Sequence, residues 1–243
     1  MKRVIGLFIV LFCGVTSLQA QFFGNKKING NGKISHETRT TEDYESIEVI
    51  GSLDVELVRG KEGSIKIEAE RNFLEYIKTN VKNNTLIIKV KKGYSLRPSI
   101  RKRIAITVPF EYISEVTLSG SGEVECTDAI KTNHFYVSVA GSGDVNLHLI
   151  TENTTASEAG SGDIKLHGKT NYLEASVEGS GDITAYELIT NTANVSVAGS
   201  GDIRLFVIES LDASVSGSGD ISYKGNPMNV EKSTVGSGDI TKR

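Results

Sequence analysis

The side chains best placed to do chemistry are acids that recur at nearly equal intervals through the second half of the chain. Each follows a Gly-Ser-Gly tripeptide, and they are Asp144, Asp163, Asp182, Asp202, Asp220 and Asp239. If equivalent residues stack about 4.8 Å apart, neighbouring carboxylates repel each other by roughly 0.9 kcal/mol in water, so a compensating interaction is expected. Each carboxylate could accept backbone N–H groups of its own turn, or the row could bind Ca²⁺. We expect the turn role, because the period is not the nonapeptide of calcium-binding β-rolls.

Few other side chains suggest a reaction. His148 and His167 are expected to be neighbours in consecutive repeats, but no third metal ligand accompanies them, and surface residues are the simpler interpretation. Cys126 alternates in phase with apolar residues and is expected to be a core thiol. No nucleophile, base and orienting group stand at a diagnostic spacing, and no Gly-Lys-Ser/Thr follows the glycines. The chain is therefore not expected to be an enzyme, to hold a metal or to use a cofactor.

Three further features are candidates for binding. A serine stands three residues before the first glycine in six repeats. Its hydroxyls could meet sugar hydroxyls, although a small solvated stack is the simpler interpretation. Glu158 interrupts an otherwise apolar row, and we expect local bending that exposes it, because a buried carboxylate needs a partner. The run 82–103 has eight Lys/Arg and no acid. It could dock an anionic polymer such as lipopolysaccharide or an acidic glycan, or be a charged edge that deters strand pairing.

The elements that must position these residues follow from the repeat itself. The first glycines of the seven Gly-Ser-Gly tripeptides are Gly120, Gly141, Gly160, Gly179, Gly199, Gly217 and Gly236. They are 18 to 21 residues apart, and an acid and then Val or Ile follow each tripeptide. Polar and apolar residues alternate on both sides, which is typical of a strand with one buried face. A unit of about 19 residues cannot bury its own apolar face, so successive units are expected to stack.

We therefore predict an all-β fold, a right-handed parallel β-helix or β-solenoid with coils of about 19 residues and a Gly-Ser-Gly corner in each coil. Regular repeats span 119–240 and looser coils span 41–118, within a single domain over 41–243. Residues 21–40 are polar and glycine-rich and are expected to be a flexible leader. Residues 1–20 have a basic start, an apolar run and a small residue at Ala20, as in a signal peptide that is cleaved after Ala20.

Composition limits the partners that the chain is expected to have. A hydrophobic content of 38% supports a packed core. Residues 1–118 have 19 Lys/Arg against 13 Asp/Glu, whereas residues 119–243 have 8 against 17. The acidic second half is unsuited to a phosphate backbone, so no nucleic acid is expected. No later segment is apolar enough to cross a membrane. After signal removal the protein is expected in the periplasm, on the outer surface or in the medium of a Gram-negative bacterium.

Several motifs resemble one bacterial family. The segment Tyr44–Gly51, the strand end Val108–Phe110 and the serial Gly-Ser-Gly-Asp turns are similar to the "putative auto-transporter adhesin, head GIN domain" family, over about residues 41–240. The resemblance implies a non-enzymatic binding module, an adhesin, with a glycan or another cell-surface molecule as its partner. The alternative is an envelope-associated scaffold without a specific ligand. A third interpretation is a β-helix enzyme that acts on polysaccharide, because the fold alone does not exclude catalysis.

Overall fold

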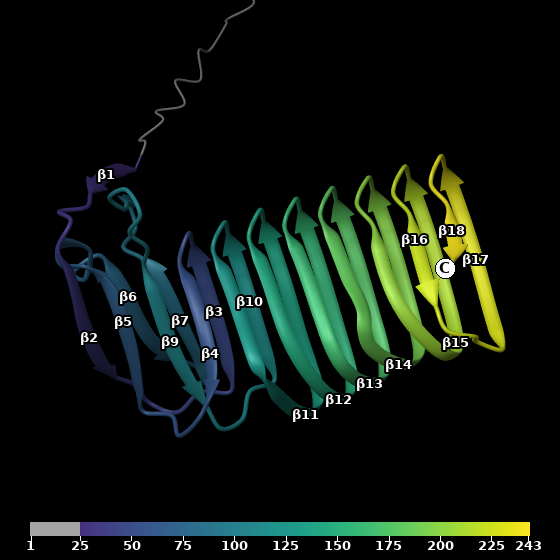
Figure 1. Ribbon diagram of the computed structural model, residues 1–243, viewed down its shortest axis with the longest axis horizontal. Helices are drawn as coiled ribbons and strands as arrows, with labels where there is room; N and C mark the ends of the chain where they lie inside the picture. Colours follow the sequence, from purple (N-terminus) through teal and green to yellow (C-terminus); the bar gives the residue numbers. More distant parts are fainter. Residues whose placement is uncertain (1–24) are drawn as a thin grey trace, which may run out of the picture.

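The computed structural model describes residues 25–243, so the predicted signal peptide lies outside the described part of the chain. Coils of β-structure stack along one axis towards the C-terminal end (Figure 1). The long strands of these coils are β11 (Glu123–Gly141), β12 (Asp144–Gly160), β13 (Asp163–Gly179), β14 (Asp182–Gly199) and β15 (Ile203–Gly217). Each pairs in parallel with the next, and Asp144 lies opposite Asp163. The predicted β-solenoid with coils of about 19 residues is confirmed.

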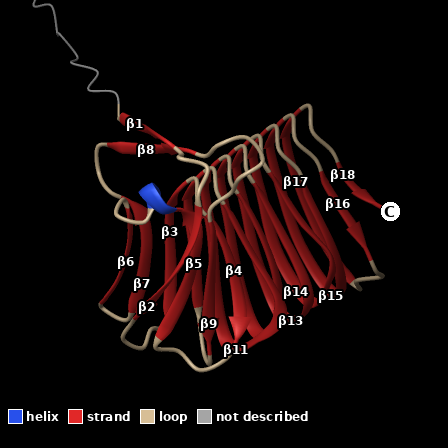
Figure 2. Cartoon of the chain, turned by 60° about the vertical axis from the view of Figure 1, so that its left-hand side comes forward, coloured by secondary structure: helices blue, strands red, loops and turns tan. Residues whose placement is uncertain are grey.

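Each coil is flattened and has two sides. In β12, inward and outward side chains alternate from Asp144 to Thr151, then Glu152 and Asn153 both face outward, and alternation resumes at Thr154. This break marks a second corner, opposite the Gly-Ser-Gly corner. We call the segment that follows Gly-Ser-Gly the leading face and the segment that returns to the next Gly-Ser-Gly the trailing face. In Figure 2, the short loops that join successive long strands form a row along the solenoid.

The interior is filled by apolar rows that run along the solenoid axis. The Val or Ile that follows the acid is buried in the first six repeats, at Val124, Val145, Ile164, Ile183, Ile203 and Ile221. Each of these side chains contacts its equivalents one coil away, and burial stabilises the stack by about 25 cal/mol per Å² of apolar surface. At the second corner the interior includes buried threonines in the middle coils. There the Oγ1 atom of Thr151 lies 2.7 Å from that of Thr154 and 2.9 Å from that of Thr170, so these buried hydroxyls have partners.

Antiparallel strands cover the N-terminal end of the solenoid. Besides β1, β2 and β8, which are described below, the elements that precede β11 are β3 (Ser46–Gly51), β4 (Asp54–Arg59), β5 (Ser64–Glu70), η1 (Arg71–Phe73), β6 (Ile77–Lys82), β7 (Thr85–Val90), β9 (Ala105–Phe110) and β10 (Glu115–Gly120). Gly51 lies opposite Gly120, so β3 and β4 form a looser coil before the first full repeat. Next to that coil, β7 pairs in parallel with β3 and β9 pairs in parallel with β4; beyond these, β5 pairs antiparallel with β9, and β6 pairs antiparallel with β7. Parallel stacking therefore stops there.

Residues 25–40 do not form the flexible leader expected from their composition. The first strand, β1 (Lys26–Asn29), pairs in parallel with β8 (Tyr94–Arg97), and β2 (Ile34–Thr40) pairs antiparallel with β5. The Arg39 guanidinium donates hydrogen bonds to the carbonyls of Leu74 and Ile77, at 2.7 and 2.6 Å. Composition does not reveal these partners, because they lie 35 and 38 residues away in the sequence.

The C-terminal end is closed by β16 (Ile221–Lys224), β17 (Asn229–Gly236) and β18 (Ile240–Lys242). In β17, two positions that are apolar in the preceding coil are polar, because Lys232 and Thr234 lie opposite Ala213 and Val215. Lys232 lies opposite the buried Ala213, donates to the carbonyl of Ile240 at 3.0 Å, and places its Nζ 5.0 Å from the centre of the Tyr223 ring. A lysine at such a position discourages further strands from adding to the end. Among residues 25–243 there is no helix long and apolar enough to cross a membrane.

Candidate functional site

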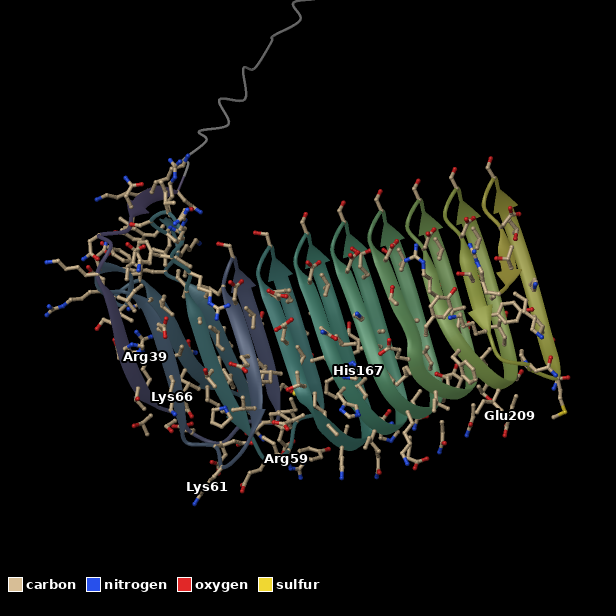
Figure 3. All side chains as sticks on the ribbon, in the orientation of Figure 1. Arg39, Arg59, Lys61, Lys66, His167 and Glu209 are labelled. Carbon is tan, nitrogen blue, oxygen red and sulfur yellow. The ribbon has the colours of Figure 1, made fainter. Side chains whose placement is uncertain are left out.

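The Gly-Ser-Gly corners are close-packed backbone, not a ligand-binding loop. Gly179 has a φ of +137°, and a Cβ atom there would lie 2.3 Å from the carbonyl oxygen of Gly160, one coil back. The third glycine of the same corner is equally confined, since a Cβ on Gly181 would lie 2.0 Å from the Gly162 oxygen. Only the middle serine projects outward, and side chains tipped with oxygen mark this row of corners in Figure 3. The corner glycines therefore have a structural role.

The aspartate row connects neighbouring coils. Oδ1 of Asp144 accepts the backbone N–H of Asp163 at 3.1 Å, and Oδ1 of Asp163 accepts that of Asp182 at 3.1 Å. The same contact recurs to the last repeat. We expected each carboxylate to accept N–H groups of its own turn, and for these bonds that expectation is wrong, because the donor belongs to the next coil. Arg204 also offsets the repulsion, since its guanidinium lies 2.8 Å from Asp182 and 2.7 Å from Asp202.

Substitutions at Asp163 test this structural role, because Asp163 has no ion-pair partner within residues 25–243. Asp163→Asn keeps the accepting oxygen and removes one repelling charge, so its free energy of unfolding should equal or slightly exceed that of the wild type. Asp163→Ala loses the acceptor and should cost about 1 kcal/mol. Thermal melts of both variants, with millimolar Ca²⁺ and with chelator, provide the measurement. A clear rise of the wild-type melting temperature with Ca²⁺, abolished by Asp163→Asn, would establish a cation ladder instead.

Glu158 is buried, contrary to the bending and exposure that we expected. It lies between Val139 and Val177 in the trailing-face row, its exposed fraction is 0%, and neither carboxylate oxygen has a hydrogen-bond partner among the described residues. Burial is the main cause that raises the pKa of Glu158, and the carboxylates of Asp163 and Asp182 add to it. The coil cannot bend outward at this position because it is hydrogen-bonded to a coil on each side.

The two predicted neighbours His148 and His167 do lie together on the leading face. Their rings stack with centroids 4.8 Å apart and planes 24° from parallel, and burial followed by the charge of His148 lowers the pKa of His167. Tyr186 and Phe206 occupy the same offset from the glycine in the next two repeats. The stack does not continue along this offset, because register shifts place Glu187 opposite His167 and Ile189 opposite Phe206. Within residues 25–243, no three His, Cys, Asp or Glu side chains are grouped so that they could hold a metal ion.

A groove of about 510 Å³ follows the second corner and is lined by residues of β11, β12, β13 and β14. One row of its lining crosses four coils in register and consists of Lys131, Ile150, Lys169 and Ile189. Ile189 is 53% exposed there, so it adds apolar surface to the groove. Cations and apolar side chains thus alternate along the groove.

A second row of the groove presents amides and a carboxylate. The side-chain amide of Asn191 donates to that of Asn171 at 3.1 Å, and the amide of Asn171 donates to the carboxylate of Glu152. Sequence analysis missed this groove because the register shifts between Cys126 and Ala129 and between Lys165 and His167. Equivalent lining residues therefore do not stand at one constant offset from the glycine.

The remaining candidates are placed as follows. The serine row lies half-buried on the trailing face, where the hydroxyls of Ser157 and Ser176 are 3.4 Å apart. The Cys126 thiol is buried, and burial raises its pKa to about 12, so it is not a reactive thiolate. The basic run 82–103 extends from the last residue of β6 through β7 and β8 to the loop that follows β8, all in the N-terminal part. Neither the cysteine nor the basic run contributes to the groove.

Comparisons with known proteins agree with this architecture. Residues 43–227 match the family described as "Putative auto-transporter adhesin, head GIN domain". A "putative adhesin" from Bacteroides fragilis NCTC 9343 is 25% identical, with a TM-score of 0.82, and the match covers 89% of this chain and 100% of that one. A "Putative lipid binding protein" from Parabacteroides distasonis ATCC 8503 is 30% identical, with a TM-score of 0.74, over 90% of this chain and 100% of that one. The comparison with curated proteins finds no match.

Proposed function

Because the chain belongs to the family described as "Putative auto-transporter adhesin, head GIN domain", we propose that it is an exported, non-enzymatic binding module of the bacterial surface or periplasm. Its ligand is an extended, acidic glycan that lies in the second-corner groove, parallel to the solenoid axis. The observation that carries this proposal is the in-register row of Lys131, Ile150, Lys169 and Ile189 along one continuous groove.

The repeat of the groove supports a polymeric ligand. Equivalent groups on successive coils are about 4.8 Å apart, a spacing similar to the advance of one sugar ring along an extended polysaccharide. Because Lys and Ile alternate along the row, every second ring can meet an equivalent set of protein groups. A compact ligand would use one or two coils, whereas the lining continues over four.

The chemistry of the groove supports a sugar with negative charge. The exposed faces of Ile150 and Ile189 can pack against the C–H faces of sugar rings. The Asn171 and Asn191 amides and the Glu152 carboxylate offer donors and acceptors to hydroxyl groups. Lys131 and Lys169 favour carboxylate, sulfate or phosphate substituents on the glycan. The names of the two solved neighbours, a "putative adhesin" and a "Putative lipid binding protein", share binding rather than catalysis.

A glycan array of neutral and acidic oligosaccharides tests the proposal, probed with the chain from Gln21 onward. The wild type should bind a subset of the acidic oligosaccharides, because the two lysines of the groove outnumber its one carboxylate, Glu152. Lys169→Ala and Ile189→Ser should each weaken that binding by about tenfold or more, as expected for central contact residues.

Lys165→Ala is the matched control. Lys165 is an exposed lysine on the same strand as Lys169, four residues earlier and outside the groove. Binding should survive this substitution. If no glycan binds, the scaffold without a specific ligand gains support and the proposal fails. If Lys165→Ala and Lys169→Ala weaken binding equally, general electrostatic attraction rather than the groove holds the glycan. Release of shortened oligosaccharides from a bound polymer would instead identify an enzyme.

A further inference from the structure

The N-terminal end of the molecule has a dense cluster of cations, none of which lines the second-corner groove. Segments 25–33 and 91–103 contain nine Lys/Arg and no Asp or Glu, and all nine side chains are exposed. Pairing of β1 with β8 joins the two segments into one small parallel sheet. Figures 1 and 2 show β1 outside the stacked coils, with β8 beside it in Figure 2, and side chains tipped with nitrogen surround β1 in Figure 3. We call segments 25–33 and 91–103 together the basic ribbon.

The basic ribbon ends in a tight turn with an apolar tip. Ile100 is 91% exposed and stands between Arg97 and Arg101 in a segment where every charged residue is a cation. The turn is closed by a hydrogen bond from the Lys102 N–H to the Ser99 carbonyl at 2.9 Å, with Arg101 at a φ of +62°. An isolated exposed isoleucine is ordinary. Here, however, the isoleucine is at the tip of a closed turn and has cations beside it in the sequence, so one surface can contact the apolar side chain and the cations together.

A buried carboxylate holds this turn in place. Glu70 is 1% exposed, and it accepts the Ser99 N–H at 2.8 Å and the Ser99 hydroxyl at 2.6 Å. It also accepts the Gly32 N–H, so a single side chain fastens both segments of the ribbon. Burial alone would raise the pKa of Glu70, but these hydrogen bonds and the charge of Lys102 lower it, and the group stays ionised. The Ile100 tip is therefore preorganised.

From this arrangement we infer that the basic ribbon docks on an anionic lipid surface, with its cations on the headgroups and the Ile100 side chain inserted at the headgroup boundary. Clusters of four to eight Lys/Arg bind anionic bilayers in this way, and an inserted apolar side chain adds to the affinity. A soluble polyanion would satisfy the cations but would leave Ile100 in water. The apolar tip is thus the feature that favours a lipid surface.

The charge of the rest of the chain determines the orientation of docking. Residues 119–243 have 17 Asp/Glu against 8 Lys/Arg, so an anionic surface repels the regular coils while it attracts the ribbon. The solenoid therefore projects from the lipid surface. This places the second-corner groove away from the membrane and accessible to a ligand, although neither inference depends on the other.

Co-sedimentation with lipid vesicles tests the inference, using the chain from Gln21 onward, which contains every strand of the described fold. Vesicles of phosphatidylcholine mixed with phosphatidylglycerol should bind the protein, and vesicles of phosphatidylcholine alone should not. The double variant Lys27→Gln/Lys92→Gln should weaken binding by more than about tenfold, and raising the salt concentration should have a similar effect. The Ile100→Ser variant should weaken binding by about tenfold.

Two matched controls separate the ribbon from general charge and general hydrophobicity. Lys61→Gln/Lys66→Gln removes the same charge from exposed lysines of the N-terminal part that lie away from β1 in Figure 3. Ile208→Ser alters an isoleucine that is 42% exposed on the solenoid. Both controls should bind the vesicles as the wild type does. The inference is overturned if phosphatidylglycerol gives no binding or if a control weakens it as much as its partner variant. Wild-type affinity of Ile100→Ser, with equally tight binding of soluble heparin, would assign the ribbon to a polyanion instead.

Discussion

Replacing the corner glycine Gly179 with alanine should lower the free energy of unfolding by on the order of 4 kcal/mol. Two costs combine in this value, namely backbone strain at a φ of +137° and a clash of the new Cβ with the Gly160 carbonyl oxygen 2.3 Å away. The oxygen cannot move aside easily, because it accepts the Ser180 N–H at 2.7 Å as part of the corner stack. Urea and thermal unfolding followed by circular dichroism provide the measurement.

Two control substitutions separate these costs. Gly51→Ala introduces a side chain at a φ of +109°, but its Cβ would have no heavy atom within 4 Å. It should therefore show the strain alone, about 1–3 kcal/mol. Ser180→Ala, at the exposed middle position of the same corner, should be almost neutral. If Gly179→Ala unfolds at the same urea concentration as Ser180→Ala, the close-packed corner does not control the stability of the coils.

The second large effect is a gain of stability. Glu158→Val should raise the free energy of unfolding at neutral pH by about 1–3 kcal/mol, because it removes a buried carboxylate that has no hydrogen-bond partner among the described residues. Valine fits the position, since Val139 and Val177 occupy it in the neighbouring coils. Glu158→Gln is the control that keeps a buried polar group but cannot ionise. Glu158→Gln should therefore raise the free energy of unfolding by less than Glu158→Val does, because it removes the charge but leaves a polar group buried.

The pH dependence identifies the charge as the cause. The folded-state pKa of Glu158 is raised above its ordinary value of 4.5, first by burial and then by Asp163 and Asp182, while the nearby Gly162 N–H opposes the shift. The neutral acid is thus favoured in the folded state. The contribution of this raised pKa to the stability of the wild type is fully present below the unfolded-state pKa, and it is lost as the pH rises through the folded-state pKa. The advantage of Glu158→Val over the wild type should therefore shrink on acidification from neutral pH. An advantage that is constant with pH would mean that the folded-state pKa of Glu158 is not raised, as for a solvated carboxylate.

Most of the architecture could be predicted because residues at equivalent positions of successive repeats contact each other. The repeat pattern therefore identifies contacts between residues that are far apart in the sequence. In a parallel stack, the neighbour of Ile183 is the same residue type one repeat earlier, at Ile164. A single pattern of alternation and corner glycines therefore specifies the inward face, the corner and the pairing partner together. The family resemblance rests on the same pattern, and for that reason it identified the fold and the family without identifying a ligand.

The features that the sequence did not reveal depend on contacts outside the repeat. The bonds of the aspartate row use donors on the next coil, and sequence alone does not distinguish these from donors in the same turn. Glu158 is buried because coils on both sides hold it in place, whereas its residue type favours exposure. The groove depends on register shifts that move its lining off a constant offset, and the basic ribbon depends on the pairing of β1 with β8 across more than sixty residues. The repeat period and the alternation of polar and apolar residues are local properties of the sequence. The partner of a polar group is decided by the folded backbone, because the energy of a hydrogen bond or a buried charge depends on distances of a few ångströms in space.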